Sequence, residues 1–161
     1  MKDYGHLLKN DDELSDVAQQ VSNKTMDICE FLAQQELDTN RINTSGEHKV
    51  AYQNPCSMQH GQKINHQPFE LLQKFGFDVT SIPEAHLCCG SAGTYNLLQS
   101  EMAARLGREK VGSIASTGAE FVASGNLGCI LQLRQYSEMP IMHTVQLLDW
   151  ASGGPRPKEI A

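Results

Sequence analysis

The chain has 161 residues, 40% of them hydrophobic, and 13 basic against 19 acidic side chains give it a net charge of −6. This length predicts one compact globular domain overall, and the acidic balance argues against nucleic acid or an anionic membrane as the main partner, because both need a concentrated basic face. No stretch approaches the roughly twenty apolar residues that span a bilayer, and the start lacks the apolar core of a signal peptide. We therefore expect a cytoplasmic chain whose five cysteines are reduced thiols or metal ligands.

Residues 1–46 are predicted to form an N-terminal helical segment ahead of the main domain at 47–161. Apolar residues recur there at steps of three and four, as on one face of a helix: Leu14, Val17, Ala18, Val21, Ile28, Phe31 and Leu32. Asn10 or Asp11 is placed to cap the first long helix, and Ser22-Asn23 to divide the segment in two. Residues 40–48 are predicted to form a loop, and Cys29 is interpreted as a small buried hydrophobe.

From Val50 onward the pattern alternates between strands and helices. Strands are predicted at 50–52, 77–82, 120–124 and 140–145, and helices at 69–75, 96–116 and 129–136. This alternation predicts an α/β fold, a Rossmann-like parallel sheet of about four strands flanked by helices and joined by right-handed crossovers. In such sheets ligands bind just beyond the carboxyl ends of the strands.

Four of the five cysteines map to that edge of the predicted sheet. Cys56 follows the first strand, Cys88 and Cys89 the second, and Cys129 the third. Because independent core thiols would not gather at one edge, a metal site is the favoured interpretation, with zinc bound by four cysteines as the main inorganic alternative. His143 is interpreted as a strand residue or a supporting residue rather than a ligand, and Leu147, Leu148 and Trp150 as core or subunit-contact residues.

The adjacent pair Cys88-Cys89 lies in the stretch His86-Leu-Cys-Cys-Gly-Ser-Ala-Gly-Thr-Tyr-Asn96. Zinc ligands usually come in pairs two to four residues apart, and a disulfide between neighbours is strained, whereas a cluster of several irons can use both thiolates. The turn 90–93 is predicted to feed a helix, whose amides and positive dipole end would stabilise thiolates and sulfide. Its glycines do not match a dinucleotide-binding fingerprint, so nothing in the sequence predicts nucleotide binding.

The spacing of these cysteines resembles the cysteine-rich "CCG" domain of heterodisulfide reductase and its relatives. That pattern is one Cys, about thirty residues, Cys-Cys-Gly, a gap in the mid-thirties, then Cys-x-x-Cys. Here 57–87 and 90–125 are the gaps, and Asn126 replaces the fifth cysteine. The segments 50–63, 86–96, 124–130 and 143–157 look like the last domain of the glycolate oxidase iron–sulfur subunit, and Tyr4-Gly-His-Leu-Leu8 is similar to the linker that enters it.

The resemblance implies an iron–sulfur cluster of 4Fe-4S type, with a noncubane form as one option and absence or zinc replacement expected in purified protein. Its expected ligands are Cys56, Cys88, Cys89 and Cys129. Further residues expected to contact it are Gly90, Asn126, His60 and His86. Asn126 is interpreted as an oxygen ligand, a hydrogen-bond donor or the residue left where a ligand was lost. The two histidines either donate to cluster sulfurs or satisfy nearby backbone groups.

The implied function is that of a non-catalytic electron-transfer component of a glycolate oxidase (glycolate dehydrogenase) complex. A flavoprotein subunit would oxidise glycolate and, with other iron–sulfur domains, pass electrons toward a quinone or another acceptor, which places the chain in the cytoplasm or peripheral to the inner membrane through its complex. One alternative is a non-redox zinc-binding or apo structural module, and another is a redox subunit of the lactate-utilisation or heterodisulfide-reductase type. The ending Asp149-Trp-Ala-Ser-Gly-Gly154 favours the glycolate type.

Overall fold

The computed structural model describes residues 1–38 and 48–160, which belong to two compact units, Met1–Gln35 and Glu36–Ala161. The predicted loop at 40–48, apart from His48, and the predicted boundary between 46 and 47 lie outside the described residues. None of the described helices is long and apolar enough to cross a membrane.

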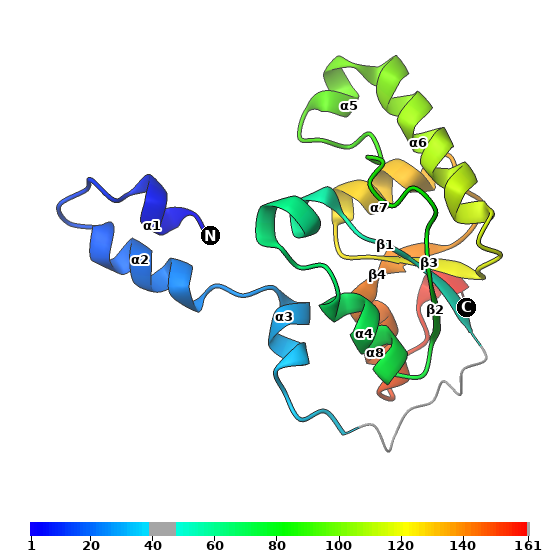
Figure 1. Cartoon of the computed structure of the whole chain (residues 1–161), viewed down its shortest axis with the longest axis horizontal. Helices are drawn as coiled ribbons and strands as arrows, with labels where there is room; N and C mark the ends of the chain where they lie inside the picture. Colours follow the sequence, from blue (N-terminus) through cyan, green and yellow to red (C-terminus); the bar gives the residue numbers. More distant parts are fainter. Residues whose placement is uncertain (39–47, 161) are drawn as a thin grey trace. The chain divides into compact units, whose positions relative to one another are not determined.

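The N-terminal unit holds three short helices, α1 (Tyr4–Leu7), α2 (Ser15–Lys24) and α3 (Ile28–Ala33) (Figure 1). The cap of α2 predicted at Asn10 or Asp11 is wrong, because the residue that precedes the helix is Leu14. Asp11 acts one turn earlier, where its carboxylate accepts the N–H groups of Glu13 and Leu14 in the turn that leads into α2. The predicted division at Ser22-Asn23 is wrong. The chain leaves the helix only at Thr25, because Asp27 and Glu30 form a capping box that begins α3.

This break also separates the predicted apolar stripe into two pieces that do not form one continuous face. Cys29 and Ala18 are buried, as expected of small residues, but much of the rest of the stripe is exposed: Leu14, Val17, Ile28 and Phe31. Burial, and then the negative charge of Asp27, raise the pKa of Cys29 to about 12, so this residue remains a thiol. The interpretation of Cys29 as a buried hydrophobe is confirmed.

The second unit is built on a parallel sheet of four strands in the order β2-β1-β3-β4. The strands are β1 (Lys49–Gln53), β2 (Asp78–Ser81), β3 (Phe121–Ser124) and β4 (Ile141–His143). β1 and β3 are buried along nearly their whole length, as expected of central parallel strands covered on both faces. The predicted α/β fold is confirmed.

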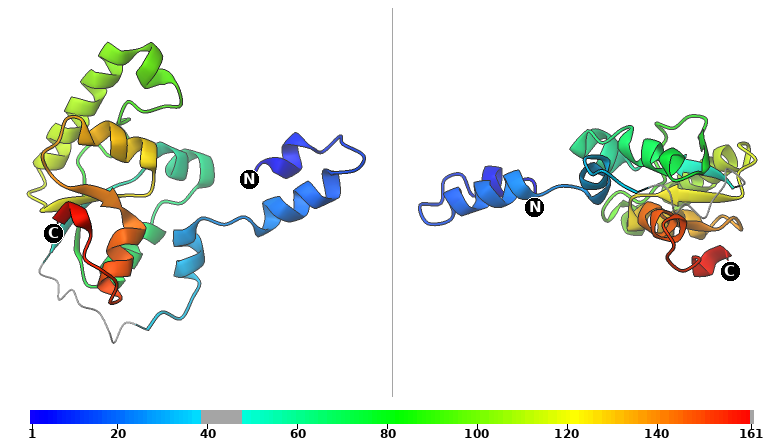
Figure 2. Two further views of the ribbon diagram at one scale, coloured as in Figure 1. Left: turned by 180° about the vertical axis from the view of Figure 1, so that it is seen from behind. Right: turned by 90° about the horizontal axis from the view of Figure 1, so that it is seen from below.

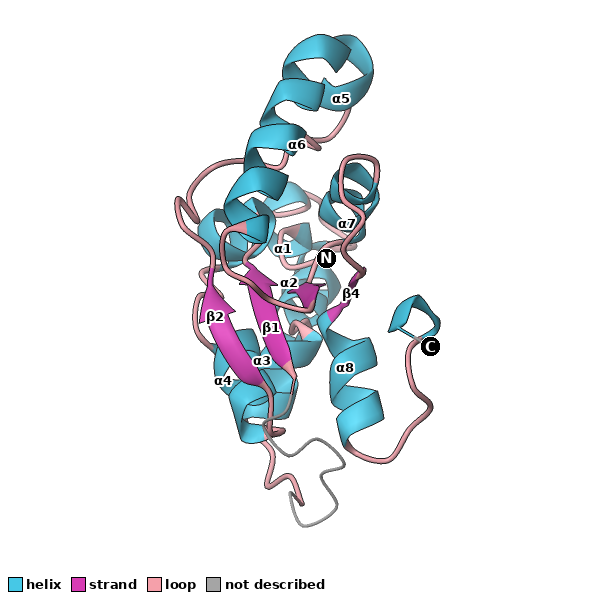
Figure 3. Ribbon diagram, turned by 90° about the vertical axis from the view of Figure 1, so that its right-hand side faces the viewer, coloured by secondary structure: helices cyan, strands magenta, loops and turns pink. Residues whose placement is uncertain are grey.

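Helices cover both faces of this sheet. Figure 3 shows α6 (Ser100–Ala115) and α7 (Leu127–Arg134) on one side, and α4 (Gln67–Lys74) and α8 (Thr144–Ala151) on the other. The short α5 (Tyr95–Leu98) and the first half of α6 extend beyond the sheet (Figure 1 and Figure 2). A π-helical turn, η1 (Ser57–Gln62), follows β1, and a 3₁₀ turn, η2 (Lys158–Ile160), lies near the C-terminus.

Two predicted elements differ from the structure. The strand predicted at 140–145 ends at His143, where His143 and Gln146 form a capping box that begins α8. The single helix predicted at 96–116 is broken at Gln99, whose φ of −128° and ψ of 53° are not helical. The helix α8 and the turn η1 were not predicted. Leu147 and Leu148 of α8 are core residues, as expected, and Trp150 packs against His48 and Phe77.

The strand order creates a switch point between β1 and β3. The chain leaves β1 toward β2 on one side and then returns to β3 on the other side of β1. At such a point the connections diverge and leave a crevice outside the carboxyl ends of the strands. A buried hydrogen bond of 2.5 Å from Ser124 Oγ to Gln53 Oε1 joins the two strand ends directly beneath it. This crevice is where a ligand site is expected.

Candidate metal centre

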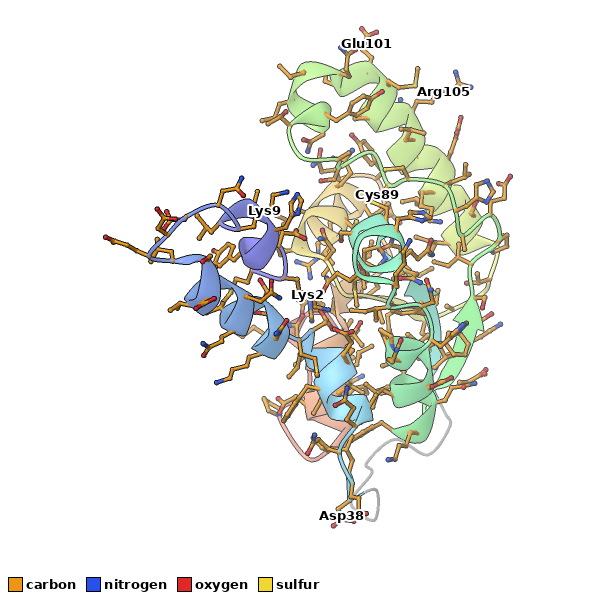
Figure 4. All side chains as sticks on the ribbon, turned by 60° about the vertical axis from the view of Figure 1, so that its left-hand side comes forward. Lys2, Lys9, Asp38, Cys89, Glu101 and Arg105 are labelled. Carbon is orange, nitrogen blue, oxygen red and sulfur yellow. The ribbon has the colours of Figure 1, made fainter. Side chains whose placement is uncertain are left out.

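Four cysteines line one small pocket at the carboxyl edge of the sheet. Cys56 comes from the end of β1 at the start of η1, Cys88 and Cys89 from the connection after β2, and Cys129 from the first turn of α7. All are free thiols, Cys89 and Cys129 are buried, and Cys56 is exposed. In Figure 4 Cys89 lies inside the unit, whereas Glu101 and Arg105 point outward from α6. The four cysteines that were predicted to converge therefore do so.

Gly90 allows the Cys88-Cys89 pair to reach this position. Its φ of +92° is rarely adopted by residues with a side chain, and a Cβ atom built there would lie 2.5 Å from the carbonyl oxygen of Ala103 on α6. The Gly90 N–H donates to the Cys88 sulfur over 3.3 Å. Glycine at this position thus permits both a close contact with α6 and a backbone hydrogen bond to a cysteine.

Cys89 and Cys129 form a hydrogen-bonded pair in which Cys89 ionises more readily than an ordinary thiol. A hydrogen bond from Cys129, reinforced by the Ser91 N–H, lowers the pKa of Cys89 to about 6. The same hydrogen bond, together with burial, raises the pKa of Cys129. Cys88 also has a raised pKa because burial outweighs the help of the Gly90 amide. A thiolate, the form that binds metals, is therefore already favoured at Cys89.

Asn126 is the residue that caps α7. Its Oδ1 accepts the backbone N–H of Cys129 over 3.1 Å, and its Nδ2 donates to Ser57 Oγ over 3.3 Å. Its side chain thus joins the first turn of η1 to the first turn of α7, the two elements that carry Cys56 and Cys129. Ser, Thr, Asp and Asn are preferred at this position of a helix because their side chains satisfy a free amide.

The two histidines predicted near the cluster occupy different places. His86 is among the residues that line the cysteine pocket, beside Leu87 and Gln53. His60 is exposed on η1 and is not among those lining residues, whereas its neighbour Gln59 is. Their suggested roles as donors to cluster sulfurs stay predictions.

Lys110 is a component of the site that the sequence analysis missed. It is only 1% exposed on α6, and its Nζ donates to the carbonyl oxygens of Glu84 and Ala85 in the connection that leads to Cys88. Burial lowers its pKa, while the negative charge of the Cys89 thiolate acts to raise it. The sequence held one signal for its burial: Lys110 lies at helical spacing from the other buried residues of α6, which are Ala103, Gly107 and Ile114.

The donor set fits an iron–sulfur cluster better than a single metal ion. Within residues 1–38 and 48–160, no three His, Cys, Asp or Glu side chains are arranged to hold one ion. A cluster does not need such an arrangement, since each thiolate can bind a different iron. The pocket measures about 10 Å³, so its lining must open for a multi-atom group. Cys56 is the exposed member of the ligand set.

Comparison with known proteins identifies the family of this chain. The pattern of the CCG family, described as a cysteine-rich domain, matches residues 50–134. The chain is 35% identical to the glycolate oxidase iron-sulfur subunit of Escherichia coli K12, over 94% of this chain and 37% of that protein. It is 31% identical to the probable glycolate oxidase iron-sulfur subunit of Bacillus subtilis, over 83% and 30% of the two chains.

Lactate utilization protein A of Oceanobacillus iheyensis is 26% identical, over 92% of this chain and 63% of that protein. The chain thus spans about a third of the glycolate oxidase subunits and somewhat under two thirds of this third relative.

Proposed function

The chain belongs to the CCG family of cysteine-rich domains, and on that premise we propose that it carries an iron–sulfur cluster and transfers electrons within an oxidase complex of the glycolate oxidase type. The observation that carries the proposal is the gathering of four cysteines from three strand ends into one pocket at the switch point of the sheet. Two relatives above 30% identity are named as glycolate oxidase iron-sulfur subunits, one of them as a probable one.

The cluster would be held by Cys56, Cys88, Cys89 and Cys129, as a 4Fe-4S group in cubane or noncubane form. Bound there, it would accept and release single electrons. The protein contributes by stabilising negatively charged sulfur: the Gly90 amide donates to Cys88, and the Ser91 amide supports Cys89. Burial of Cys89 and Cys129 would keep water from half of the ligand set, while Cys56 faces solvent.

His86 and Asn126 would serve the cluster indirectly, as residues that border it. His86, which lines the pocket, would donate to a cluster sulfur. Asn126 would maintain the geometry of Cys129 through its cap, and it leaves one iron position without a fifth thiolate. His60, on the exposed side of η1, would act only after a rearrangement of that turn.

The electron donor would be a flavoprotein subunit that oxidises glycolate, with further iron–sulfur domains and a quinone or similar acceptor completing the path. Glycolate is favoured over lactate because identity to the glycolate oxidase subunits is 35% and 31%, against 25–29% for lactate utilization proteins. The complex would work in the cytoplasm or at the inner face of a membrane.

The flavoprotein would contact the exposed apolar side chains beside the centre. Leu97 and Leu98 of α5 and Leu127 and Leu131 of α7 are each more than half exposed, and Asn96 of α5 is hydrogen-bonded to Gln132 of α7. Exposed apolar patches commonly mark protein–protein interfaces. These side chains lie on α5, the first helix after the Cys88-Cys89 pair, and on α7, which carries Cys129 in its first turn, so a partner bound there would be close to the cluster.

A reversible redox titration tests the proposal. Protein reconstituted anaerobically with iron and sulfide should lose its visible absorbance on addition of dithionite and regain it with a mild oxidant such as dichlorophenolindophenol. The matched control is Cys29→Ser, which removes the one cysteine outside the site and should titrate like wild type. Zinc-bound protein without reversible absorbance would instead support a structural zinc module.

A further inference from the structure

Lys110 is unusual because a long charged side chain is almost completely removed from solvent. It is the largest of the fully buried side chains in the described part of the chain. Lysine is rarely buried to this extent unless a partner compensates its charge, because desolvation of an ammonium group is unfavourable. The compensation must come from groups inside the second unit.

Two backbone carbonyls satisfy part of its hydrogen-bonding capacity. Lys110 Nζ lies 3.2 Å from the oxygen of Glu84 and 3.1 Å from that of Ala85. Glu84 has a φ of 51°, a left-handed conformation that residues other than glycine adopt infrequently. Lys110 thus secures an irregular turn only a few residues before Cys88, and fixes the start of the segment that carries the adjacent cysteines.

No carboxylate among the described residues forms an ion pair with Lys110. Its backbone partner Ala85 lines the same pocket as the four cysteines, so the ammonium group is held beside that pocket. Gly107, on the same buried face of α6, packs against Cys89, because a Cβ atom built at Gly107 would lie 3.6 Å from the Cys89 carbonyl oxygen. The adjacent cysteines and any cluster they hold would therefore interact electrostatically with one buried cation. An interaction of this kind is strong because it takes place away from water.

We propose that Lys110 is the fixed counter-cation of the cysteine centre, a positioning residue that raises the reduction potential of the bound cluster and holds the Glu84–Ala85 turn against α6. This inference rests on the proposed iron–sulfur function. Reduction adds one electron, and so one negative charge, to the cluster without forming or breaking a bond. A nearby positive charge stabilises the reduced form more than the oxidised form, and net charge is one of the factors that set cluster potentials.

Three substitutions separate the charge of Lys110 from its hydrogen bonds. Lys110→Met removes both, Lys110→Gln retains an N–H donor without charge, and Lys110→Arg retains the charge. Lys49→Met is a matched control. Lys49 Nζ also donates to a backbone carbonyl, that of Thr117, but Lys49 begins β1 and therefore lies at the opposite edge of the sheet from the cysteines.

The measurement is a redox titration of each anaerobically reconstituted protein, followed by visible absorbance and electron paramagnetic resonance, with iron per chain determined on the same samples. We expect the reduced-to-oxidised ratio at a fixed potential to fall about tenfold in Lys110→Met and Lys110→Gln, equivalent to a lowering of about 59 mV for a one-electron couple. Lys110→Arg and Lys49→Met should stay near the wild-type value.

Wild-type potentials in Lys110→Gln and Lys110→Met at full iron content would overturn the inference and leave the iron–sulfur function standing. An equal shift in Lys110→Arg would also overturn it, because the effect would then follow the hydrogen-bond geometry and not the charge. If Lys110→Met does not fold, the comparison of Gln with Arg decides. Failure of the wild-type protein to assemble any cluster would overturn the proposed function itself.

Discussion

Asn126 occupies the position where the family pattern has a cysteine, and its side chain is already engaged as a helix cap. The Oδ1 atom accepts the Cys129 N–H, and the Nδ2 atom donates to Ser57. A side-chain amide is a poor iron ligand beside a thiolate. One iron of the cluster should therefore be weakly held, or bound by something other than cysteine.

Replacing Asn126 with Cys should complete the five-thiolate set and slow the loss of iron in air. The helix cap would be lost at a cost of about 1 kcal/mol in the free energy of unfolding of the apo protein. Asn126→Ser is the matched control, because it keeps a capping oxygen without a thiolate and should lose iron at the wild-type rate. The measurement is iron per chain against time of exposure to oxygen. Equal decay in the Cys and Ser variants would contradict the assignment.

Glu120 gives the protein a small pH-dependent contribution to stability at the amino edge of the sheet. Its carboxylate pairs with His48 Nδ1 over 3.0 Å and accepts the Lys49 N–H, and these contacts hold its pKa below the usual value. A carboxylate with a lowered pKa stabilises the fold above its ordinary pKa, and this contribution is lost as the pH falls through the lowered value.

Glu120→Gln should therefore lower the stability of the apo protein at pH 7 and have little effect near pH 3. Because the Glu120 side chain is 49% exposed, the expected loss is only about 0.5 kcal/mol. Urea unfolding at the two pH values measures it, with the exposed Glu138→Gln as control. A larger loss at pH 3 than at pH 7 would mean that the carboxylate does not stabilise the fold through its charged form.

Among the structural elements, α6 and the Cys-Cys-Gly turn approach one another closely at Gly90. Gly90→Ala would place a methyl group 2.5 Å from the Ala103 carbonyl oxygen at a φ of +92°. We expect a loss of roughly 2–3 kcal/mol in thermal or urea unfolding of the apo protein and reduced iron uptake.

Gly93→Ala provides the comparison for Gly90. Gly93 also has a positive φ, of +55°, but a Cβ atom there would meet nothing within 4 Å. Its substitution should cost about 1 kcal/mol, from backbone strain alone. If the two variants are equally stable, close packing of the turn on α6 does not position the cysteines.

The elements that were predicted correctly have strong local patterns. Runs of Val, Ala and aromatic residues at β1 and β3 are typical of buried parallel strands. Because each cysteine follows a strand, the edge of the sheet that carries the cysteines could be predicted from the order of the strands. Helix α8 was missed because its start depends on a capping box at His143, whose residues also fit the end of a strand. The role of Lys110 depends on which face of α6 is buried, and this is fixed by packing against a distant turn.

At the scale of the whole molecule, the second unit has a core that does not need metal. Residues with no exposure come from both central strands and from helices on both faces, such as Val50, Val122, Leu72, Leu133 and Leu147. Proteins that depend on metal for folding, such as zinc fingers, lack such a core.

Removal of metal by a chelator should therefore lower the thermal unfolding temperature without abolishing the cooperative transition. Circular dichroism of loaded and chelated protein measures this, and retention of the helical and sheet signal at 25 °C is the expected result. Complete unfolding on chelation would show that the metal is structural, and would favour the zinc-module alternative.

The proposed function depends on a cluster in which each cysteine thiolate binds its own iron. The proposed ligands are Cys56, Cys88, Cys89 and Cys129. The most direct test is the iron, sulfide and zinc content per chain after anaerobic reconstitution with iron and sulfide, for wild type, Cys88→Ser, Cys89→Ser and Cys29→Ser. We predict several irons with sulfide in wild type and Cys29→Ser, and loss of assembly in Cys88→Ser and Cys89→Ser. One zinc without sulfide in wild type, or a full cluster in Cys88→Ser, would contradict this claim.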